Sequence, residues 1–425
     1  MTAFAITQAD LLRVCRDLAW SEISAMPGLA QRLGPRIGPR TGPQGAADWS
    51  ASGLALDSLA RMQLATAAAT WCNAYDAGFE DLFLAKRSAA DWAAVMLRAR
   101  AGGAAHFTFS SSGSTGVRKH IRHREDVLAQ EAQAWAHVLG SAASRAATPT
   151  SRVVVLVPTH HIYGFIWGVL LPLALKVPLI DADLADMPDL MPGDLVIAVP
   201  DQWAYLASSG TPWPPGVQGI SSTAPLPHAI HRQLIDQPAS GTGAPLARLL
   251  QIYGSSETAG LAWRAGPEAP YTLAPSRTRT AQDDIELLLP SGLTALMPVQ
   301  DQLKWVSDSQ FELLQRSDSS VQVGGHNVSP DWVAQQLQSH PAVQQAAVRL
   351  DTSVTPPRLK AFVVLRAPLN QPHDPSQQQA LEAWALDTLP WYAALSSFTY
   401  GSVLPLNAMG KPSDWLVAGL PAGSA

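Results

Sequence analysis

The stretch "FTFSSSGSTGVRK", residues 107–119, joins an alternating apolar segment to a loop of hydroxyl residues and glycines. Apolar alternation predicts a strand, and small residues after it let the backbone approach a ligand closely. Such a loop can present backbone N–H groups and hydroxyls to a polyphosphate, and Lys119 adds a cation. It is not a Walker loop, because Gly113 and Gly116 are three apart and His120 follows the lysine. Taken alone, the stretch fits a phosphate loop and a serine-rich linker equally well.

The composition describes a globular chain without a strong charge bias. The chain has 425 residues, of which 47% are hydrophobic, enough for large cores in two or three domains. Its formal net charge of −5 argues against nucleic acid as the main partner. Two cysteines cannot form a disulfide framework, and the N-terminus does not resemble a signal peptide, so we expect a cytoplasmic protein. The most apolar run, residues 162–175, is too short to span a membrane and is expected to be a buried helix.

The pattern of apolar residues divides the chain into three parts. Residues 1–100 show helical spacing in several segments and look all-helical. From residue 105, short apolar runs alternate with helical stretches, which argues for an α/β sheet covered by helices. We therefore predict an α/β multi-domain fold, with a helical domain over 1–100, a core that binds ATP and the acid over 101–316, and a small α+β domain over 317–425.

Later segments decide between the phosphate loop and the linker. "SSGSTGVRK" (111–119) resembles the phosphate loop of the adenylate-forming superfamily, which includes acyl-CoA synthetases, nonribosomal-peptide adenylation domains and luciferases. Further segments resemble that superfamily's motifs in its order: "PTHHIYG" (158–164), "SSTAPL" (221–226), "YGSSE" (253–257), "VQD" (299–301), "QRSDSSVQVGGHNVSP" (315–330) and "LPLNAMGK" (404–411). Seven matches in order, over residues 105–416, identify the chain as a member of this superfamily.

The resemblance implies that ATP and a small carboxylic acid react to give acyl-AMP and pyrophosphate, and that a thiol then takes the acyl group. The barrier is largely one of charge placement, so cations, backbone donors and Mg²⁺ carry the catalysis. The residues implied to bind the phosphates are Ser111, Ser112, Ser114, Thr115 and Lys119. Those implied for adenine and ribose are Ala224, Tyr253, Gly254, Ser256, Asp301 and Arg316.

The resemblance also implies the remaining site residues. Glu257, with Thr115, would bind Mg²⁺, an ion that prefers oxygen ligands. The acyl pocket would be lined by His161, Tyr163, Gly164 and Phe165. The implied catalytic residues are Lys411, on the small C-terminal domain, His161 and Glu257. Asp318 would be the hinge about which the small, mobile C-terminal domain turns between the two half-reactions.

The N-terminal hundred residues depart from the superfamily. They are fewer than usual before the phosphate loop, and they resemble an acyl carrier protein, with Asp57 and Ser58 opening a long helix. Ser58 would then carry phosphopantetheine; alternatively, Asp57 and Ser58 form only the N-cap of a helical docking domain. A compact ligase with a carrier-like N-terminus resembles the ligases of aryl-polyene and xanthomonadin-type pigment pathways, which load a hydroxybenzoate-like acid onto a carrier protein.

The sequence thus predicts an ATP-dependent ligase that activates an aryl acid and transfers it to the phosphopantetheine of an acyl carrier protein. One alternative is an acyl-CoA ligase that uses free CoA and has a structural N-terminal domain. Another is a non-catalytic relative that binds a nucleotide or a carrier. The expected ligands are ATP and Mg²⁺, with phosphopantetheine carried by Ser58 or by a partner carrier protein. We expect no nucleic-acid partner and no membrane span.

The lysine implied to act on the carboxylate and α-phosphate gives the first prediction. Replacement of Lys411 with alanine should abolish most acyl-AMP formation, because a cation that stabilises the developing charge is lost. ATP–pyrophosphate exchange measures this step directly. Exchange that persists at the wild-type rate in the variant would contradict the role of Lys411.

Overall fold

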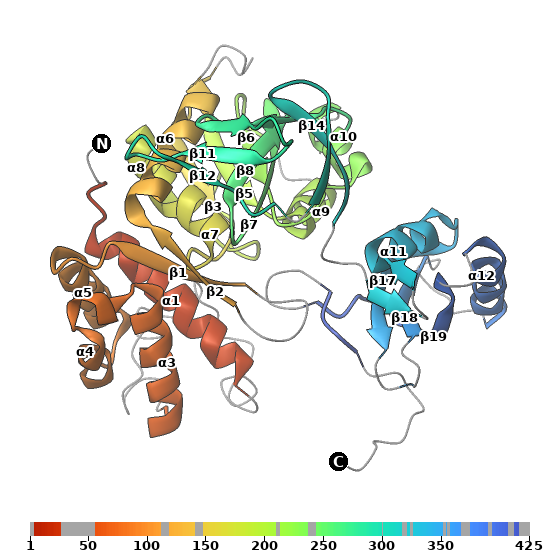
Figure 1. Ribbon diagram of the computed structural model, residues 1–425, viewed down its shortest axis with the longest axis horizontal. Helices are drawn as coiled ribbons and strands as arrows, with labels where there is room; N and C mark the ends of the chain where they lie inside the picture. The colour runs from red at the N-terminus through yellow and green to blue at the C-terminus, as the bar shows by residue number, and fades with distance from the viewer. Residues whose placement is uncertain are drawn as a thin grey trace. The chain divides into compact units, whose positions relative to one another are not determined.

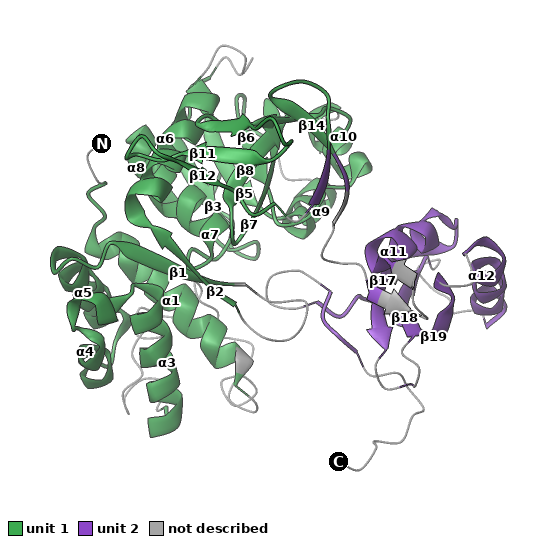
Figure 2. Cartoon of the chain, viewed as in Figure 1, with its two compact units in different colours: residues 1–299, 304–312 green, residues 300–303, 313–425 purple. Residues whose placement is uncertain are grey.

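The chain forms two compact units. In the computed structural model, unit 1 comprises residues 1–299 and 304–312, and unit 2 comprises residues 300–303 and 313–425 (Figure 2). The residues that the structure describes are 4–26, 56–111, 119–140, 148–209, 213–236, 244–299, 301–316, 321–323, 326–351, 354, 358–366, 375–389, 393–406 and 412–415.

The N-terminal part of unit 1 is helical, as its sequence spacing predicts. Its α-helices are α1 (Gln8–Ala25), α3 (Ser58–Trp71), α4 (Glu80–Ala85) and α5 (Ala89–Ala101), with a short 3-10 turn, η2 (Ala74–Ala77) (Figure 1). Thr7 and Asp10 form a capping box at the start of α1, and Asp57 accepts a hydrogen bond from the Ala60 N–H at the start of α3.

These helices do not form the separate domain that the sequence predicts. They share one continuous hydrophobic core with the strands and helices that follow them. Trp71, at the end of α3, packs against Phe107, Phe109 and Phe165, with ring centroids 4.9, 6.0 and 5.2 Å away. The apolar spacing shows that each helix buries one face, but it does not show which partner covers that face.

A nine-stranded sheet forms the centre of unit 1, in the order β13-β14-β9-β8-β7-β6-β5-β3-β4. The strands β4, β3, β5, β6 and β7 run parallel, and β8, β9 and β14 follow in antiparallel pairing. Their bounds are β3 (Arg152–Val155), β4 (Leu179–Asp181), β5 (Asp194–Ala198), β6 (Gln218–Ser221), β7 (Arg248–Ser255), β8 (Ala259–Arg264), β9 (Tyr271–Leu273), β13 (Asp301–Trp305) and β14 (Gln310–Arg316). The α/β core predicted from the short apolar runs is confirmed.

Helices cover this sheet, and the described residues of unit 1 also form two smaller sheets (Figure 1). The helices are α6 (Glu125–Gly140), α7 (Ile162–Phe165), the π-helical turn η3 (Ile166–Leu170), α8 (Leu171–Leu175), α9 (Pro200–Ser208) and α10 (His228–Asp236). The smaller sheets are the hairpin β1 (His106–Ser111) with β2 (Lys119–Arg124), and the set β10 (Arg277–Arg279), β11 (Ile285–Leu288) and β12 (Thr294–Leu296). No helix among the described residues is long and apolar enough to cross a membrane.

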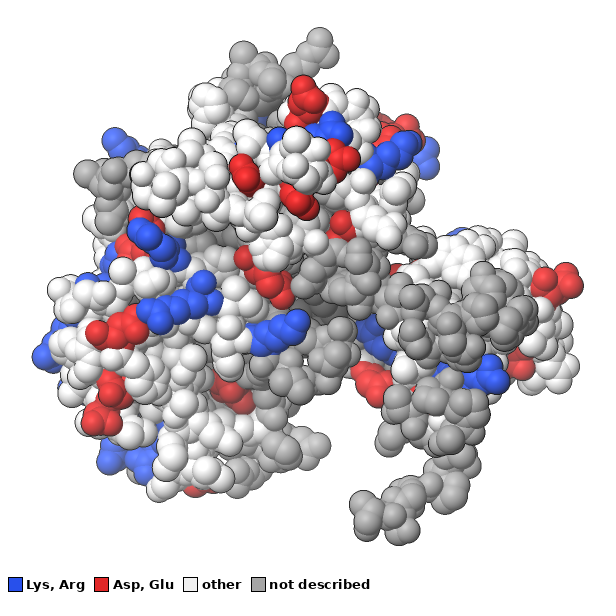
Figure 3. Space-filling model, viewed as in Figure 1, with Lys and Arg blue, Asp and Glu red and all other residues white. Residues whose placement is uncertain are grey.

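The described residues of unit 2 form a two-stranded sheet, a three-stranded sheet and two α-helices. Its elements are β15 (Val321–Val323), β16 (His326–Val328), α11 (Pro330–Ser339), β17 (Val343–Asp351), β18 (Arg358–Leu365), α12 (Pro375–Thr388) and β19 (Leu395–Tyr400). The boundary between the units falls within the β13–β14 hairpin, a few residues before the predicted boundary at 316. On the face of the molecule in Figure 3, acidic and basic side chains are mixed, in keeping with the small net charge.

The aromatic cluster around Trp71 gives a prediction about stability. Replacement of Trp71, which is 3% exposed, with alanine should lower the free energy of unfolding by about 3–5 kcal/mol, because a large buried side chain leaves a cavity. Urea denaturation followed by circular dichroism measures the change. Leu59 lies on the same helix and is 65% exposed, so Leu59→Ala is the matched control, with an expected change within about 0.5 kcal/mol. Equal losses in the two variants would contradict the shared core.

Candidate active site

Three of the seven sequence motifs lie at one edge of the central sheet. The segment 158–164 follows β3, the segment 221–226 begins at the end of β6, and Tyr253 lies near the end of β7. These strands are parallel, so their carboxyl ends meet at the same edge. Ligands of α/β sheets bind outside the carboxyl ends of such strands.

Hydrogen bonds join these segments to one another. The phenol oxygen of Tyr163 lies 3.1 Å from the carbonyl oxygens of Ala198 and Ile220, at the ends of β5 and β6. The Ser222 hydroxyl donates to the Ile252 carbonyl oxygen, which joins the segment after β6 to β7. Three motifs that are far apart in the sequence therefore meet within unit 1.

The N-terminal helices hold the segment that carries His161. The carboxylate of Asp17, on α1, accepts hydrogen bonds from the Thr159 backbone N–H at 2.6 Å and from the Thr159 hydroxyl at 2.7 Å. The indole N–H of Trp71 donates to the His160 carbonyl oxygen at 2.9 Å. Both contacts are buried, so they fix the backbone immediately before His161. No sequence motif indicated Asp17, because a single acid in an amphipathic helix looks like a solvated residue.

Gly164 is required by close packing. A Cβ atom added there would lie 2.0 Å from the Pro158 carbonyl oxygen, so a larger residue would displace the turn.

His161 and Tyr163 are both half-buried, and burial raises the pKa of the Tyr163 phenol well above its ordinary value.

Phe165, which the sequence predicts in the acyl pocket, lies in the aromatic cluster around Trp71. It is fully buried and packs against Phe107 and Phe109 as well as Trp71, so it belongs to the hydrophobic core. The motif shows that aromatic residues cluster in this segment, but the tertiary structure decides which of them faces the core.

Glu257 lies in the turn between β7 and β8. Gly254 lets the two strands at this turn approach closely, because a Cβ atom on Gly254 would lie 1.9 Å from the Ala259 carbonyl oxygen. The Ser255 hydroxyl accepts hydrogen bonds from the backbone N–H groups of Glu257 and Thr258. Ala259 has a φ of 56°, in the left-handed region that an alanine seldom adopts. The turn that presents Glu257 is therefore tightly constrained.

A buried ion pair between Glu131 and Arg277 contacts the strand that follows this turn. Glu131 on α6 accepts a hydrogen bond from the Gly260 backbone N–H at 2.8 Å and one from the Trp135 indole at 3.0 Å. Its other oxygen lies 2.6 Å from the Arg277 guanidinium, and both side chains are at most 3% exposed. This pair could not be predicted from the sequence, because its members are 146 residues apart and belong to no motif.

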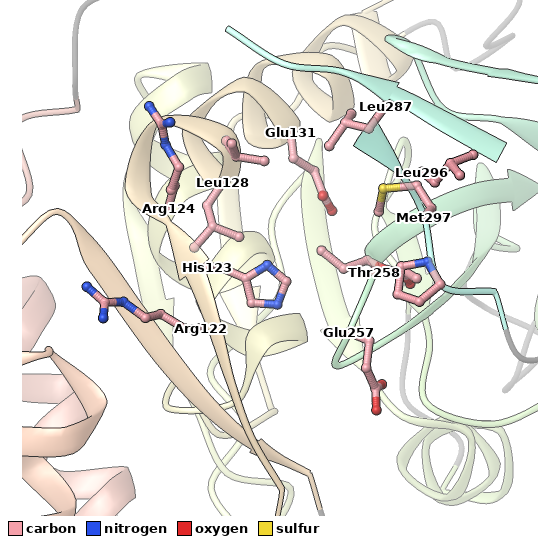
Figure 4. Close-up of a pocket in the computed structure, with 13 residues that line it drawn as sticks. Arg122, His123, Arg124, Leu128, Glu131, Glu257, Thr258, Leu287, Leu296 and Met297 are labelled. Atoms are coloured by element: carbon pink, nitrogen blue, oxygen red, sulfur yellow. The ribbon is translucent and has the colours of Figure 1, made fainter. Parts of the chain in front are cut away.

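A cavity of about 230 Å³ opens in front of the turn (Figure 4). One part of its wall is polar and includes His123, Glu257 and Thr258. The other part is apolar and comes from Val127, Leu128, Leu287, Leu296, Met297 and Pro298.

Comparison with known proteins identifies the family. A family model described as "AMP-binding enzyme" matches residues 65–288. The chain belongs to this family. It is 36% identical to a 4-coumarate–CoA ligase of Halorhodospira halophila, over 95% of this chain and 98% of that protein. It is 34% identical to a 4-coumarate–CoA ligase of Rhodobacter capsulatus, over 85% of this chain and 90% of that protein. The solved structure of ATP-bound MatB from Rhodopseudomonas palustris shares the fold, with a TM-score of 0.55 and 20% identity, covering 76% of this chain and 71% of that one.

The site of this AMP-binding enzyme suits a magnesium ion bound together with phosphates. Within the described residues, Glu257 has no hydrogen-bonded or ion-paired partner for its carboxylate, and no group of three or more His, Cys, Asp or Glu could hold a metal. Mg²⁺ usually binds through one or two carboxylates and the phosphates of the substrate, so a single carboxylate that lines a cavity fits it.

Each of the other predicted residues either has a place in a described element or lies outside the described part of the enzyme. Lys119 is exposed at the start of β2 and pairs with Ser111 across the hairpin whose tip is the phosphate loop. Ala224 is exposed, next to Thr223, whose φ of 80° is strained for a β-branched residue. Ser256 follows β7, Asp301 begins β13 and Arg316 ends β14. The predicted residues that lie outside the described part are Ser112, Ser114, Thr115, Asp318 and Lys411.

Ser58 lies in the first turn of α3. It is the first residue of α3, directly after the N-cap Asp57, and the Arg61 guanidinium donates to its hydroxyl at 3.3 Å. The residue is exposed, so these contacts leave its hydroxyl accessible.

The buried ion pair gives a prediction with a partial rescue. Arg277→Met should lower the free energy of unfolding by about 3–5 kcal/mol, because Glu131 is left charged and buried without its counterion. Adding Glu131→Gln removes that charge and keeps an acceptor for the Gly260 N–H, so the double variant should recover part of the loss. Chemical denaturation of both variants measures the two values. A double variant no more stable than Arg277→Met would contradict this account.

Proposed function

We propose that the protein is an AMP-forming ligase that activates an aryl carboxylic acid and transfers it to the thiol of CoA. The main support for this proposal is the similarity to two 4-coumarate–CoA ligases over most of the length of each chain. An aryl acid of the 4-coumarate type is therefore the proposed substrate class, with the hydroxybenzoates predicted from the sequence as a second group.

The described side chains support the adenylation step. Glu257 is proposed to bind Mg²⁺, which would neutralise phosphate charge during the attack on the α-phosphate. Lys119, at the end of the hairpin that carries the phosphate loop, would add a second cation. The half-buried His161 and Tyr163, held at the sheet edge, are proposed to contact the acid. Lys411, outside the described residues, stays a prediction as the catalytic cation.

Two observations favour CoA over a carrier protein as the acceptor. Two relatives that match 95% and 85% of this chain are named 4-coumarate–CoA ligases. In addition, the N-terminal helices are packed into the core of unit 1, and Trp71 anchors α3 to the segment before His161. Both support a structural role for residues 1–100. Transfer to an acyl carrier protein, phosphopantetheine on Ser58 and a place in pigment biosynthesis remain predictions from the sequence.

One experiment tests both half-reactions. The purified protein is incubated with ATP, Mg²⁺ and a panel of 4-coumarate, hydroxybenzoates and fatty acids, and ATP–pyrophosphate exchange is measured. CoA or a phosphopantetheinylated carrier protein is then added, and the thioester is identified by mass spectrometry. We expect exchange with aryl acids and formation of the CoA thioester. Absence of exchange with every acid would overturn the proposal, and a thioester found only on the carrier would restore the first prediction from the sequence.

The Ser58→Ala variant is the matched control for the N-terminal region. We expect no phosphopantetheine mass on the wild-type protein after treatment with a phosphopantetheinyl transferase, and unchanged CoA ligation by the variant. A mass increase that Ser58→Ala removes would show that the serine is a carrier site.

A further inference from the structure

His123 lies on β2, the strand that leaves the phosphate loop. Side chains alternate along a strand, so Lys119, Ile121 and His123 share one face of β2. Across the hairpin, Ile121 pairs with Phe109 and His123 with Phe107, and both phenylalanines are buried. Ile121 and His123 are half-buried on this face and turn toward the interior of unit 1, whereas Lys119 is exposed at the start of the strand.

The imidazole of His123 makes a short hydrogen bond to the turn between β7 and β8. Its Nε2 atom lies 2.7 Å from the Ser256 carbonyl oxygen. A carbonyl oxygen can only accept, so Nε2 carries the proton and donates. Burial lowers the pKa of His123 below its ordinary value. The hydrogen bond selects the tautomer with the proton on Nε2.

This hydrogen bond connects two parts of the proposed magnesium–phosphate site. Ser256 directly precedes Glu257, and both His123 and Glu257 line the cavity in Figure 4. Within the turn, the Ser255 and Thr258 hydroxyls fix the local backbone. The contact from His123 instead fixes the whole turn relative to the hairpin that carries Lys119.

We propose that His123 is a positioning residue that holds Glu257 in register with the phosphate-binding hairpin. The inference rests on the proposed function, in which Glu257 binds Mg²⁺ and Lys119 binds phosphate. Mg²⁺ demands near-ideal octahedral geometry, so a small displacement of its carboxylate ligand weakens binding. His123 acts through the Ser256 carbonyl and need not touch the ion or the acid.

Three variants test this role. His123→Ala removes the donor, whereas His123→Gln places an amide N–H₂ near the former position of Nε2. His120→Ala is the matched control, because His120 is exposed on the opposite face of the same strand and contacts Ser110. Each variant is assayed for the Mg²⁺ concentration that gives half-maximal ATP–pyrophosphate exchange, for the KM of the acid, and for the rise in melting temperature that MgATP produces.

The expected pattern separates positioning from general stability. Loss of one hydrogen bond should raise the half-maximal Mg²⁺ concentration of His123→Ala by about two- to tenfold, while the KM for the acid stays within about twofold. His123→Gln should recover most of the affinity, and His120→Ala should behave as wild type. An unchanged Mg²⁺ requirement in His123→Ala, or a His123→Gln variant as impaired as His123→Ala, would overturn the inference.

A double-mutant cycle tests whether His123 acts through Glu257. In a Glu257→Ala background, His123→Ala should cause no further loss of the thermal shift by MgATP, because the carboxylate that it positions is gone. Additive losses would overturn the inference. The thermal shift needs no turnover, so it tests His123 even if no acid supports exchange, a result that would overturn only the proposed function.

Discussion

The buried ion pair between Glu131 and Arg277 is the interaction on which the site geometry depends. A carboxylate with at most 3% exposure is costly to bury unless its oxygens are all engaged, and here Gly260, Trp135 and Arg277 engage them. Because these partners come from β8, α6 and β10, the pair holds a helix, a strand of the central sheet and a strand of a smaller sheet together. The turn with Glu257 lies just before Gly260, so its position follows from that anchor.

The N-terminal helices also contact the candidate site, through the segment that carries His161. Asp17 and Trp71 bind the backbone at Thr159 and His160, and the segment with His161 begins there. The N-terminal helices are thus part of the hydrophobic core of unit 1. This arrangement is difficult to combine with a carrier domain that must move to deliver a bound acyl group, because moving α3 would expose the aromatic cluster around Trp71.

Much of the fold could be predicted from local pattern. Buried parallel strands such as β3 and β5 are continuous apolar runs ended by proline or glycine, and that signal needs no partner. The N-cap at Asp57 and the strand that leads into the phosphate loop were likewise predicted from local pattern. The burial of Phe165 and the roles of Asp17, Glu131 and His123 could not be predicted, because each depends on a residue brought close by the fold.

By itself, the sequence determined the alternation of strands and helices, the order of the motifs and the chemistry of their side chains. These are properties of residue type and spacing along the chain. The tertiary structure decided that the helices of residues 1–101 share the core of the large unit and that β2 and α6 contact the backbone on either side of Glu257, at Ser256 and Gly260. It also decided that Tyr163 reaches two strand ends while Phe165 is buried. Such contacts join residues up to about 150 positions apart, and only the packing of the complete chain selects them.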